Sequence, residues 1–165
     1  MSSPTSPSPS VQPDPSKPLV VGVALIDDPA APRRILAARR SAPEALAGLW
    51  EFPGGKAEPG EGPRAALERE VHEELGVQVR LGVEVESADP RGWLLANGAF
   101  MRVFVGVLRA GSAGPEPLED HDLLQWTALT RGDLHALDWI PADRPIVDAL
   151  LDRLAPDTLR TAPAV

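Results

Sequence analysis

Three glutamates stand close together near the middle of the chain, at positions 70, 73 and 74. On a helix, the spacing i, i+3 and i+4 places Glu70, Glu73 and Glu74 on one face. Carboxylates at this spacing repel one another, so the helix must either expose them to water or bind a cation between them. Clustered oxygens of this kind suit Mg²⁺ or Mn²⁺. The spacing therefore predicts either a metal site or an ordinary solvated acidic surface.

The neighbouring residues favour the metal site. Leu67, Val71 and Leu75 recur every four residues and form an apolar stripe beside the glutamates. An acidic cluster that borders the core is expected to lie in a cleft. Gly54 and Gly55 precede it, and glycine tolerates positive φ and lets the backbone approach a ligand closely. A backbone carbonyl of this pair is expected to complete the oxygen shell, although Pro-Gly-Gly alone would indicate an ordinary turn.

The helix that carries the glutamates has clear end signals. Pro63 suits the first helical position, where its missing N–H costs nothing, and Gly62 is the expected N-cap. Gly76 suits a left-handed C-terminal cap. The helix is therefore predicted to span residues 63–75.

The remaining elements are strands before and after this helix. Apolar runs and alternating patterns predict strands, with residues 33–40 as the second strand of a hairpin and residues 88–98 as a loop or hairpin tip. The predicted strands are residues 19–26, 33–40, 49–52, 77–87, 99–110 and 123–129. Residues 130–137 and Arg144–Leu154 are predicted helices. Hairpins mixed with crossovers predict an α/β (α+β) fold with a mixed sheet between helices.

Composition limits the possible functions. The 165 residues suffice for one domain, and the net charge of −8 argues against a nonspecific nucleic-acid binder. The absence of cysteine excludes disulfides, thiol nucleophiles and cysteine zinc sites. Residues 1–17 are rich in Pro and Ser and are expected to be disordered, residues 18–155 to form the domain, and residues 156–165 to be a loose tail. No apolar run has membrane-spanning length, so a cytoplasmic location is expected.

The stretch from residue 55 to residue 77 fits the pattern G-x5-E-x7-R-E-U-x-E-E-x-G-U, in which U is a bulky apolar residue. The specified positions are Gly55, Glu61, Arg69, Glu70, Val71, Glu73, Glu74, Gly76 and Val77. The chain thus resembles the Nudix box at every fixed position. The flanking stretches LWEFPGGK, DHDLLQW and LDWIPADRPIVDAL are similar to the MutT branch of that family. The resemblance covers roughly residues 19–154.

The resemblance implies an α/β/α sandwich with a mixed sheet and the hydrolysis of a nucleoside diphosphate linked to another group. In the MutT branch, a nucleoside triphosphate yields the monophosphate and pyrophosphate. Divalent ions lower the pKa of water and neutralise phosphate oxygens. By similarity Glu70, Glu73 and Glu74 are the metal ligands and catalytic residues, with a carbonyl of Gly54 or Gly55. Glu70 is the favoured general base, and Mg²⁺ the expected ion, for which Mn²⁺ can substitute.

The resemblance also implies roles around the box. Glu61 and Arg69 are expected to form a structural pair that fastens the loop to the helix. Arg40 matches a phosphate-contacting arginine, although an exposed strand-end arginine is an equal alternative. Asp120 is expected to be a further metal ligand, with Glu119 as the alternative. His121 is expected to be a loop or core-edge residue.

The base is expected to be recognised next to the last helix. Asp143 stands where the enzyme acting on 8-oxo-dGTP has Asn, and an ionised Asp only accepts, which matches the exocyclic amine of cytosine. Asp143 alternatively caps the helix that begins at Arg144. Phe52 and Trp93 are candidates to stack on the base. Trp126 and Trp139 are expected in the core.

The sequence therefore predicts a Mg²⁺-dependent nucleoside triphosphate pyrophosphohydrolase that removes 8-oxo-dGTP or a cytosine nucleotide from the nucleotide pool. The alternatives are hydrolysis of another diphosphate such as ADP-ribose, and a sensor that binds a nucleotide without cleaving it. A nucleotide is the expected partner, with no nucleic acid and no membrane, and the protein is expected to be a monomer or homodimer.

Overall fold

The computed structural model describes residues 10–154. It contains eight strands, three α-helices and two short 3-10 turns within that range. In chain order these are β1 (Val20–Leu25), β2 (Arg34–Arg40), η1 (Glu44–Leu46), β3 (Trp50–Glu51), β4 (Gly54–Lys56), α1 (Pro63–Leu75), β5 (Val79–Val85), β6 (Trp93–Leu94), β7 (Phe100–Leu108), β8 (His121–Ala128), α2 (Arg131–His135), η2 (Pro141–Asp143) and α3 (Arg144–Leu154). None of the described helices is long and apolar enough to cross a membrane.

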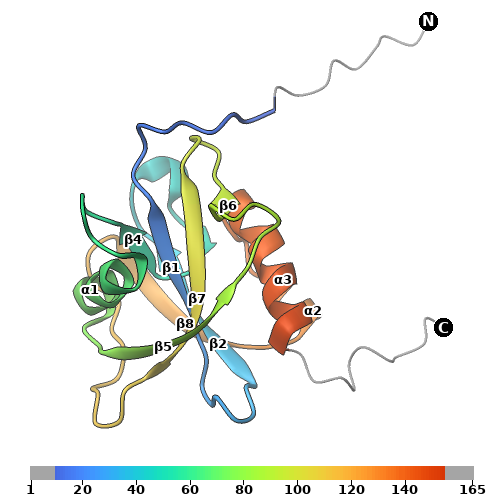
Figure 1. The fold of residues 1–165 in the computed structure, drawn as a ribbon. Helices are drawn as coiled ribbons and strands as arrows, with labels where there is room; N and C mark the ends of the chain where they lie inside the picture. The colour runs from blue at the N-terminus through green and yellow to red at the C-terminus, as the bar shows by residue number, and fades with distance from the viewer. Residues whose placement is uncertain (1–9, 155–165) are drawn as a thin grey trace, which may run out of the picture.

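The strands form two sheets (Figure 1). The first has the order β4-β1-β7-β5, with β6 paired to β7, and is mixed because β1 and β7 run parallel. The second is antiparallel, with the order β3-β2-β8. The predicted mixed fold is confirmed, but the predicted hairpin of residues 19–26 and 33–40 is wrong. Both edges of β1 are taken by β4 and β7, so β2 enters the other sheet and meets the chain directly after β1 at the isolated Ile26–Ile35 bridge.

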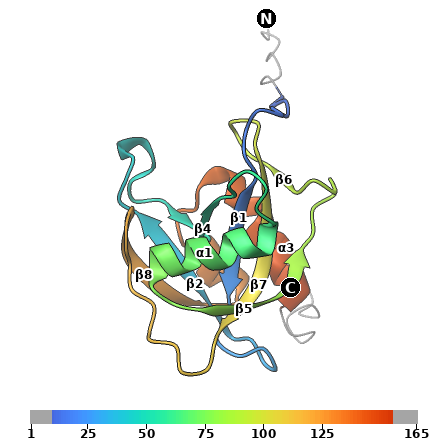
Figure 2. The ribbon, with the colours of Figure 1, turned by 60° about the vertical axis from the view of Figure 1, so that its left-hand side comes forward.

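Helices cover both sides of these sheets, with α1 on one side and α2 and α3 on the other (Figures 1 and 2). The period-two alternation of β1 explains this arrangement. Val21 and Val23 pack in one buried cluster with Leu67 of α1, whereas Ala24 packs in a second cluster with Ile146 of α3. The molecule is therefore a sandwich of helix, sheet and helix.

The boundaries of α1 agree with its sequence signals. Gly62 is the N-cap, Pro63 is the first helical residue, and Gly76 has the left-handed C-cap conformation, with φ of 69°. The Gly76 amide donates to the carbonyl of His72. Among the buried residues of this helix stands one charged side chain, Glu74.

The segment at Gly54 and Gly55 is not the ordinary turn that Pro-Gly-Gly alone would indicate. Both residues lie in β4, an edge strand that pairs with the first residues of β1, and neither has positive φ. At the N-terminus, residues 1–9 of the predicted tail lie outside the described residues. Residues 10–17 are described, and the Asp14 amide donates to the Gly98 carbonyl. The predicted C-terminal tail, residues 156–165, also lies outside the described residues.

Candidate active site

Glu74 is a buried carboxylate that α1 directs against β4. Its side chain is 8% exposed, and its Oε2 accepts a hydrogen bond of 3.0 Å from the Gly54 amide. Burial raises the pKa of Glu74 to about 7, so the group carries its charge at neutral pH only in part. Gly54 is required here because a Cβ on it would lie 1.8 Å from the Val21 carbonyl oxygen. Strands β1 and β4 can approach this closely only through a glycine.

Glu70 rests on the second glycine of β4. A Cβ on Gly55 would lie 2.3 Å from the carboxylate of Glu70. Burial is the main cause of a raised pKa for Glu70, and the negative charges of Glu73 and Glu119 add to it. The glycine pair was predicted for positive φ and for close approach of the backbone to a ligand; the first reason is wrong, and the second stays a prediction. Gly55 leaves room for the Glu70 carboxylate, and Gly54 leaves room for the backbone of β1.

Arg69 fastens these elements together. Its guanidinium forms two hydrogen bonds of 2.9 Å with Glu61, whose pKa it lowers to about 2. The same group donates to the Lys56 carbonyl, and its Nη1 donates to Glu70 at 3.0 Å and to Glu73 at 3.2 Å. The guanidinium therefore ties the loop after β4 to α1 and compensates two of the clustered carboxylates.

The described carboxylates fit a divalent cation, although they do not converge on one point. Within residues 10–154, no three acidic or histidine side chains surround a common position. Instead the Arg69 Nη1 lies between Glu70 and Glu73 and supplies positive charge there. Hard divalent ions prefer carboxylate oxygens as ligands. Two of the carboxylates, those of Glu70 and Glu74, are largely buried beside the two glycines of β4.

A cavity of about 350 Å³ opens on β4 beside these groups. Its lining includes both glycines, Arg40, Glu51, Phe52 and Asp143. Residues from the loop after β6 and from η2 with its N-cap also line the cavity, namely Leu95, Ala96, Asn97, Ile140 and Ala142. The cavity has apolar walls and a few polar groups, as small-molecule sites do.

Glu51 was not predicted as a site residue. It accepts hydrogen bonds from Arg40 Nη1 at 3.0 Å and shares one of 2.8 Å with His121 Nε2. Burial alone would lower the pKa of His121, but the bond to Glu51 and the charge of Glu74 raise it. The sequence did offer one sign of its role. Glu51 lies between the buried aromatics Trp50 and Phe52, and a charged side chain in such a place needs a partner.

The two acids considered for the additional metal ligand, Asp120 and Glu119, interact with different residues. Asp120 is 64% exposed in its side chain and lies 3.6 Å from Arg40. Glu119, which has a positive φ of 52°, is the one whose charge acts on Glu70. His121 begins β8 with a fully buried side chain, and its Nδ1 has no partner among the described residues. Of the two acids, Glu119 thus contributes to the raised pKa of Glu70, whereas Asp120 pairs with Arg40.

Asp143 is buried and faces the cavity from η2. Its carboxylate is 4% exposed and accepts a 3.4 Å hydrogen bond from the Phe52 amide. Burial raises the pKa of Asp143 to about 7. Because η2 runs directly into α3, Asp143 lies within the helical turn and its carboxylate bonds across to Phe52 instead of capping the helix.

The two predicted stacking residues differ from expectation. Phe52 is 2% exposed, and its ring lies 5.1 Å from that of Trp139, so it is a core residue that also forms part of the cavity wall. Trp93 is half-buried in β6, and its indole N–H donates to the Val85 carbonyl. The cavity is lined by Leu95, Ala96 and Asn97 of the same segment and not by Trp93. Trp139 is buried as predicted.

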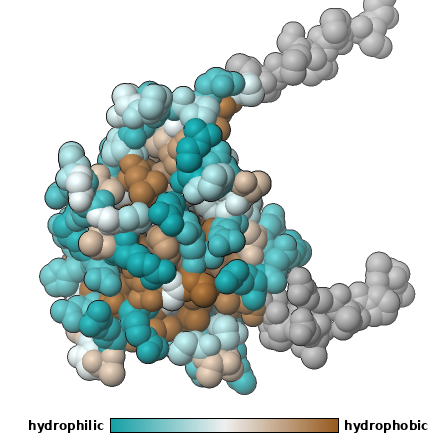
Figure 3. Space-filling view, viewed as in Figure 1, coloured by the Kyte–Doolittle hydropathy of each residue, from teal (hydrophilic) through white to brown (hydrophobic). Residues whose placement is uncertain are grey.

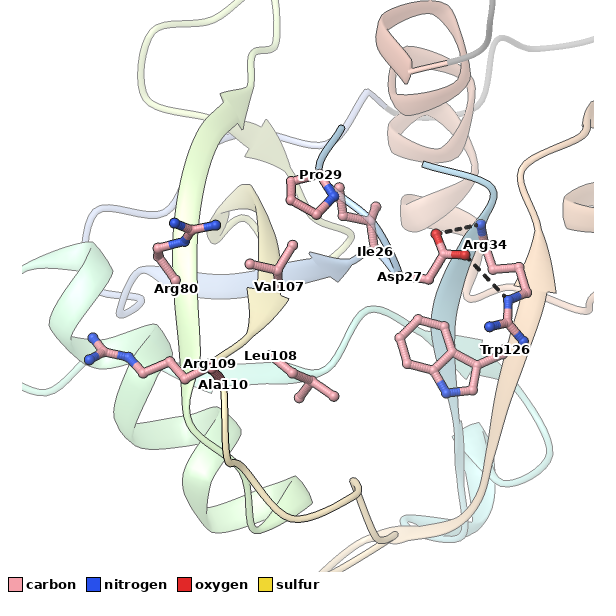
Figure 4. Close-up of a pocket in the computed structure, with 10 residues that line it drawn as sticks. All are labelled: Ile26, Asp27, Pro29, Arg34, Arg80, Val107, Leu108, Arg109, Ala110 and Trp126. Carbon is pink, nitrogen blue, oxygen red and sulfur yellow. Dashed lines mark hydrogen bonds and ion pairs between the residues drawn. The ribbon is translucent and has the colours of Figure 1, made fainter. Parts of the chain in front are cut away.

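A larger cavity, of about 700 Å³, opens at the other end of β1 (Figure 4). Its carboxylate, Asp27, is held by Arg34, and the guanidinium groups of Arg80 and Arg109 point away from Trp126. Apolar side chains gather on this part of the surface (Figure 3). Trp126 is half-buried, packs against the edge of a core cluster and lines the cavity, so its predicted core position is confirmed only in part.

Comparisons with known proteins agree with this geometry. The model of the family described as NUDIX domain matches residues 16–150. A protein of Mycobacterium tuberculosis named "putative 8-oxo-dGTP diphosphatase 2" is 43% identical over 112 residues, which is 67% of this chain and 74% of the relative. The CTP pyrophosphohydrolase of Escherichia coli is 36% identical over 121 residues, 72% of this chain and 82% of that protein.

A solved structure shows the same fold. The MutT NUDIX hydrolase from Burkholderia pseudomallei is 32% identical, with a TM-score of 0.57 over 81% of this chain and 97% of that one. Nudix hydrolases act on nucleotide substrates and generally use divalent metal ions. The carboxylates on α1, the glycines of β4 and these matches lead to one conclusion: the chain belongs to the NUDIX family of hydrolases.

Proposed function

We propose that the protein is a Mg²⁺-dependent nucleoside triphosphate pyrophosphohydrolase, which releases a nucleoside monophosphate and pyrophosphate from 8-oxo-dGTP or a cytosine nucleotide. One observation carries the proposal. The glycines that contact Glu70 and Glu74 also line a cavity that reaches the buried Asp143. The carboxylates proposed for the cations thus lie against the glycines of β4, and the same glycines and the polar group proposed for the base line one cavity. The relatives named above support this substrate class.

The acidic residues would hold the ions. Glu70, Glu73 and Glu74 are the proposed ligands, with a carbonyl of Gly54 or Gly55 and with Glu119 in preference to Asp120. The bound ion lowers the pKa of water and neutralises phosphate charge. Glu70 accepts the proton of the attacking water, since its raised pKa makes it a better base than an exposed glutamate.

Other residues orient the substrate. Arg40 is fixed by Glu51 and by the Ala42 carbonyl, with its guanidinium at the cavity wall, where it would bind a phosphate. Asp143 would bind the base. Its pKa of about 7 allows two forms, an ionised form that accepts from the amine of cytosine and a protonated form that donates to a purine carbonyl.

A nucleotide panel with Mg²⁺ tests the proposal. The protein is incubated with 8-oxo-dGTP, dGTP, CTP, dCTP and ADP-ribose, and pyrophosphate and phosphate are measured separately. Pyrophosphate from 8-oxo-dGTP or a cytosine nucleotide is expected. Cleavage of ADP-ribose alone would support the second enzyme hypothesis, and binding without turnover would support a sensor.

The variant D143N tests base recognition in the same panel. Asn keeps the shape of Asp143 but can no longer be ionised, so activity on cytosine nucleotides is expected to fall relative to activity on 8-oxo-dGTP. An unchanged ratio between the two substrates would remove Asp143 from base recognition.

A further inference from the structure

The N-terminal segment contacts a loop that forms part of the nucleotide cavity. Gln12 and Asp14 precede residues 16–150, the stretch matched by the family model. The Asp14 amide donates a 2.9 Å hydrogen bond to the carbonyl of Gly98. Figures 1 and 2 both show this segment beside the loop that joins β6 to β7. The contact therefore connects the cavity loop to residues that lie outside the family match.

Gly98 packs directly against this N-terminal segment. It is buried and has a φ of 87°. A Cβ at this position would lie 2.8 Å from the Gln12 carbonyl oxygen and 2.9 Å from the Cβ of Asp14. The loop and the segment therefore pack with no space for a side chain between them, as a specific contact requires.

The other side of the same loop faces the cavity. The loop is a tight turn in which the Leu95 amide donates to Ala99 and the Gly98 amide donates to Leu95. Leu95, Ala96 and Asn97 line the cavity of about 350 Å³. A displacement of the turn at Gly98 would therefore move part of the cavity wall.

The segment is itself held in place. The carboxylate of Asp14 accepts hydrogen bonds from the backbone and side chain of Ser16, and the Lys17 amide donates to the Asp14 carbonyl. This turn leads directly into β1, whose first residues, Val20 and Val21, also line the cavity. The segment thus connects two parts of the cavity wall.

We propose that residues 12–14 act as a brace that positions the 95–98 loop and thereby sets the affinity of the cavity for its nucleotide. The inference rests on the proposed function for the identity of the ligand. The brace touches no proposed catalytic group, so it acts on substrate binding and not on the chemical step.

Paired variants test the brace. D14P removes the amide that donates to Gly98, whereas D14N keeps both the amide and an acceptor for Ser16. A deletion of residues 2–14 removes the brace, whereas a deletion of residues 2–9 leaves it. D14P and the longer deletion are expected to raise KM about threefold to tenfold, the range that loss of one backbone hydrogen bond allows, with kcat unchanged. D14N and the shorter deletion are expected to match the parent protein.

Amide hydrogen exchange of residues 95–99 in the nucleotide-free protein gives an independent readout. Faster exchange in D14P and the longer deletion is expected, with exchange in β1 and β7 unchanged as evidence of folding. Because no substrate is present, this readout stands even where the nucleotide panel finds no turnover. Unchanged loop exchange, or faster exchange with an unchanged KM in an active protein, would overturn the proposal.

Discussion

The two ends of β1 each open into a cavity, and they differ in how their charges are satisfied. At the Ile26 end, Asp27 accepts from the backbone amides of Arg33 and Arg34 and from the Arg34 side chain. At the Val20 end, Glu74 is buried with the Gly54 amide as its donor and has a pKa raised to about 7. The cavity of about 700 Å³ lies at the end with Asp27, and that of about 350 Å³ lies at the end with Glu74. A buried carboxylate with a raised pKa, and not cavity size, distinguishes the end at which the active site is proposed.

Replacing a carboxylate by an amide at each end of β1 is expected to give the largest difference in activity. E70Q is expected to lower kcat about 10²- to 10⁴-fold because it removes a proposed ligand and the general base. D27N keeps an oxygen for the amides of Arg33 and Arg34 and is expected to leave kcat unchanged. Steady-state pyrophosphate release measures both. Comparable rates for the two variants would mean that the ends do not differ in function.

Adding one methyl group behind Glu70 tests the glycine contact. In G55A the new Cβ overlaps the Glu70 carboxylate, which can move because it is the end of a flexible side chain. The displaced carboxylate is expected to lower kcat about 10- to 100-fold while circular dichroism stays native. G114A is the control, because a Cβ there meets no atom within 4 Å. Equal rates in G55A and G114A would show that the position of Glu70 is unimportant.

The buried charge should also affect stability. The carboxyl of Glu74 titrates near 4.5 when unfolded and near 7 when folded, so between these values the folded protein binds more protons. The free energy of unfolding of the metal-free protein should therefore fall by about 3 kcal/mol as the pH rises from 4.5 to above 7. E74Q should lose this part of the pH dependence, and Mg²⁺ should restore stability to the parent at pH 8. Urea titrations at several pH values measure the effect, and identical pH profiles for E74Q and the parent would contradict it.

The smallest effect on activity is expected at the larger cavity. W126A removes a half-buried ring that packs beneath Arg34, at 5.6 Å from the guanidinium, and should cost about 1–3 kcal/mol of stability. Both kcat and KM are expected to stay at the parent values. Thermal melting and steady-state kinetics separate these quantities. A large loss of turnover in the folded variant would show that the larger cavity also contributes to activity.

The helix that carries the carboxylates was predictable because its signals are local. Pro63, Gly76 and the apolar stripe determine the helix in isolation, and the spacing of the glutamates follows from it. The function of Gly55 was not predictable in the same way. Its neighbour in space is Glu70, fifteen positions along the chain, and only the packing of α1 on β4 shows why no side chain fits between them.

The errors have a common cause in sheet pairing. Sequence patterns identified β1 and β2 as strands but could not show that they enter different sheets, since that depends on which strands take the edges of β1. The same uncertainty affected Trp126, whose exposure depends on where the two sheets separate. Glu51 and His121 were not recognised as a pair because seventy positions separate them.

The contacts of Arg69 have a consequence for how the protein takes up its ions. Glu70 and Glu73 already share a guanidinium, so an incoming ion must exchange with it and cannot simply enter an empty shell. A monovalent ion gains little from that exchange because it carries no more charge than the group it displaces. A doubly charged ion therefore has an advantage, and until it binds, the single charge of Arg69, which Glu61 shares, offsets the acidic face only in part.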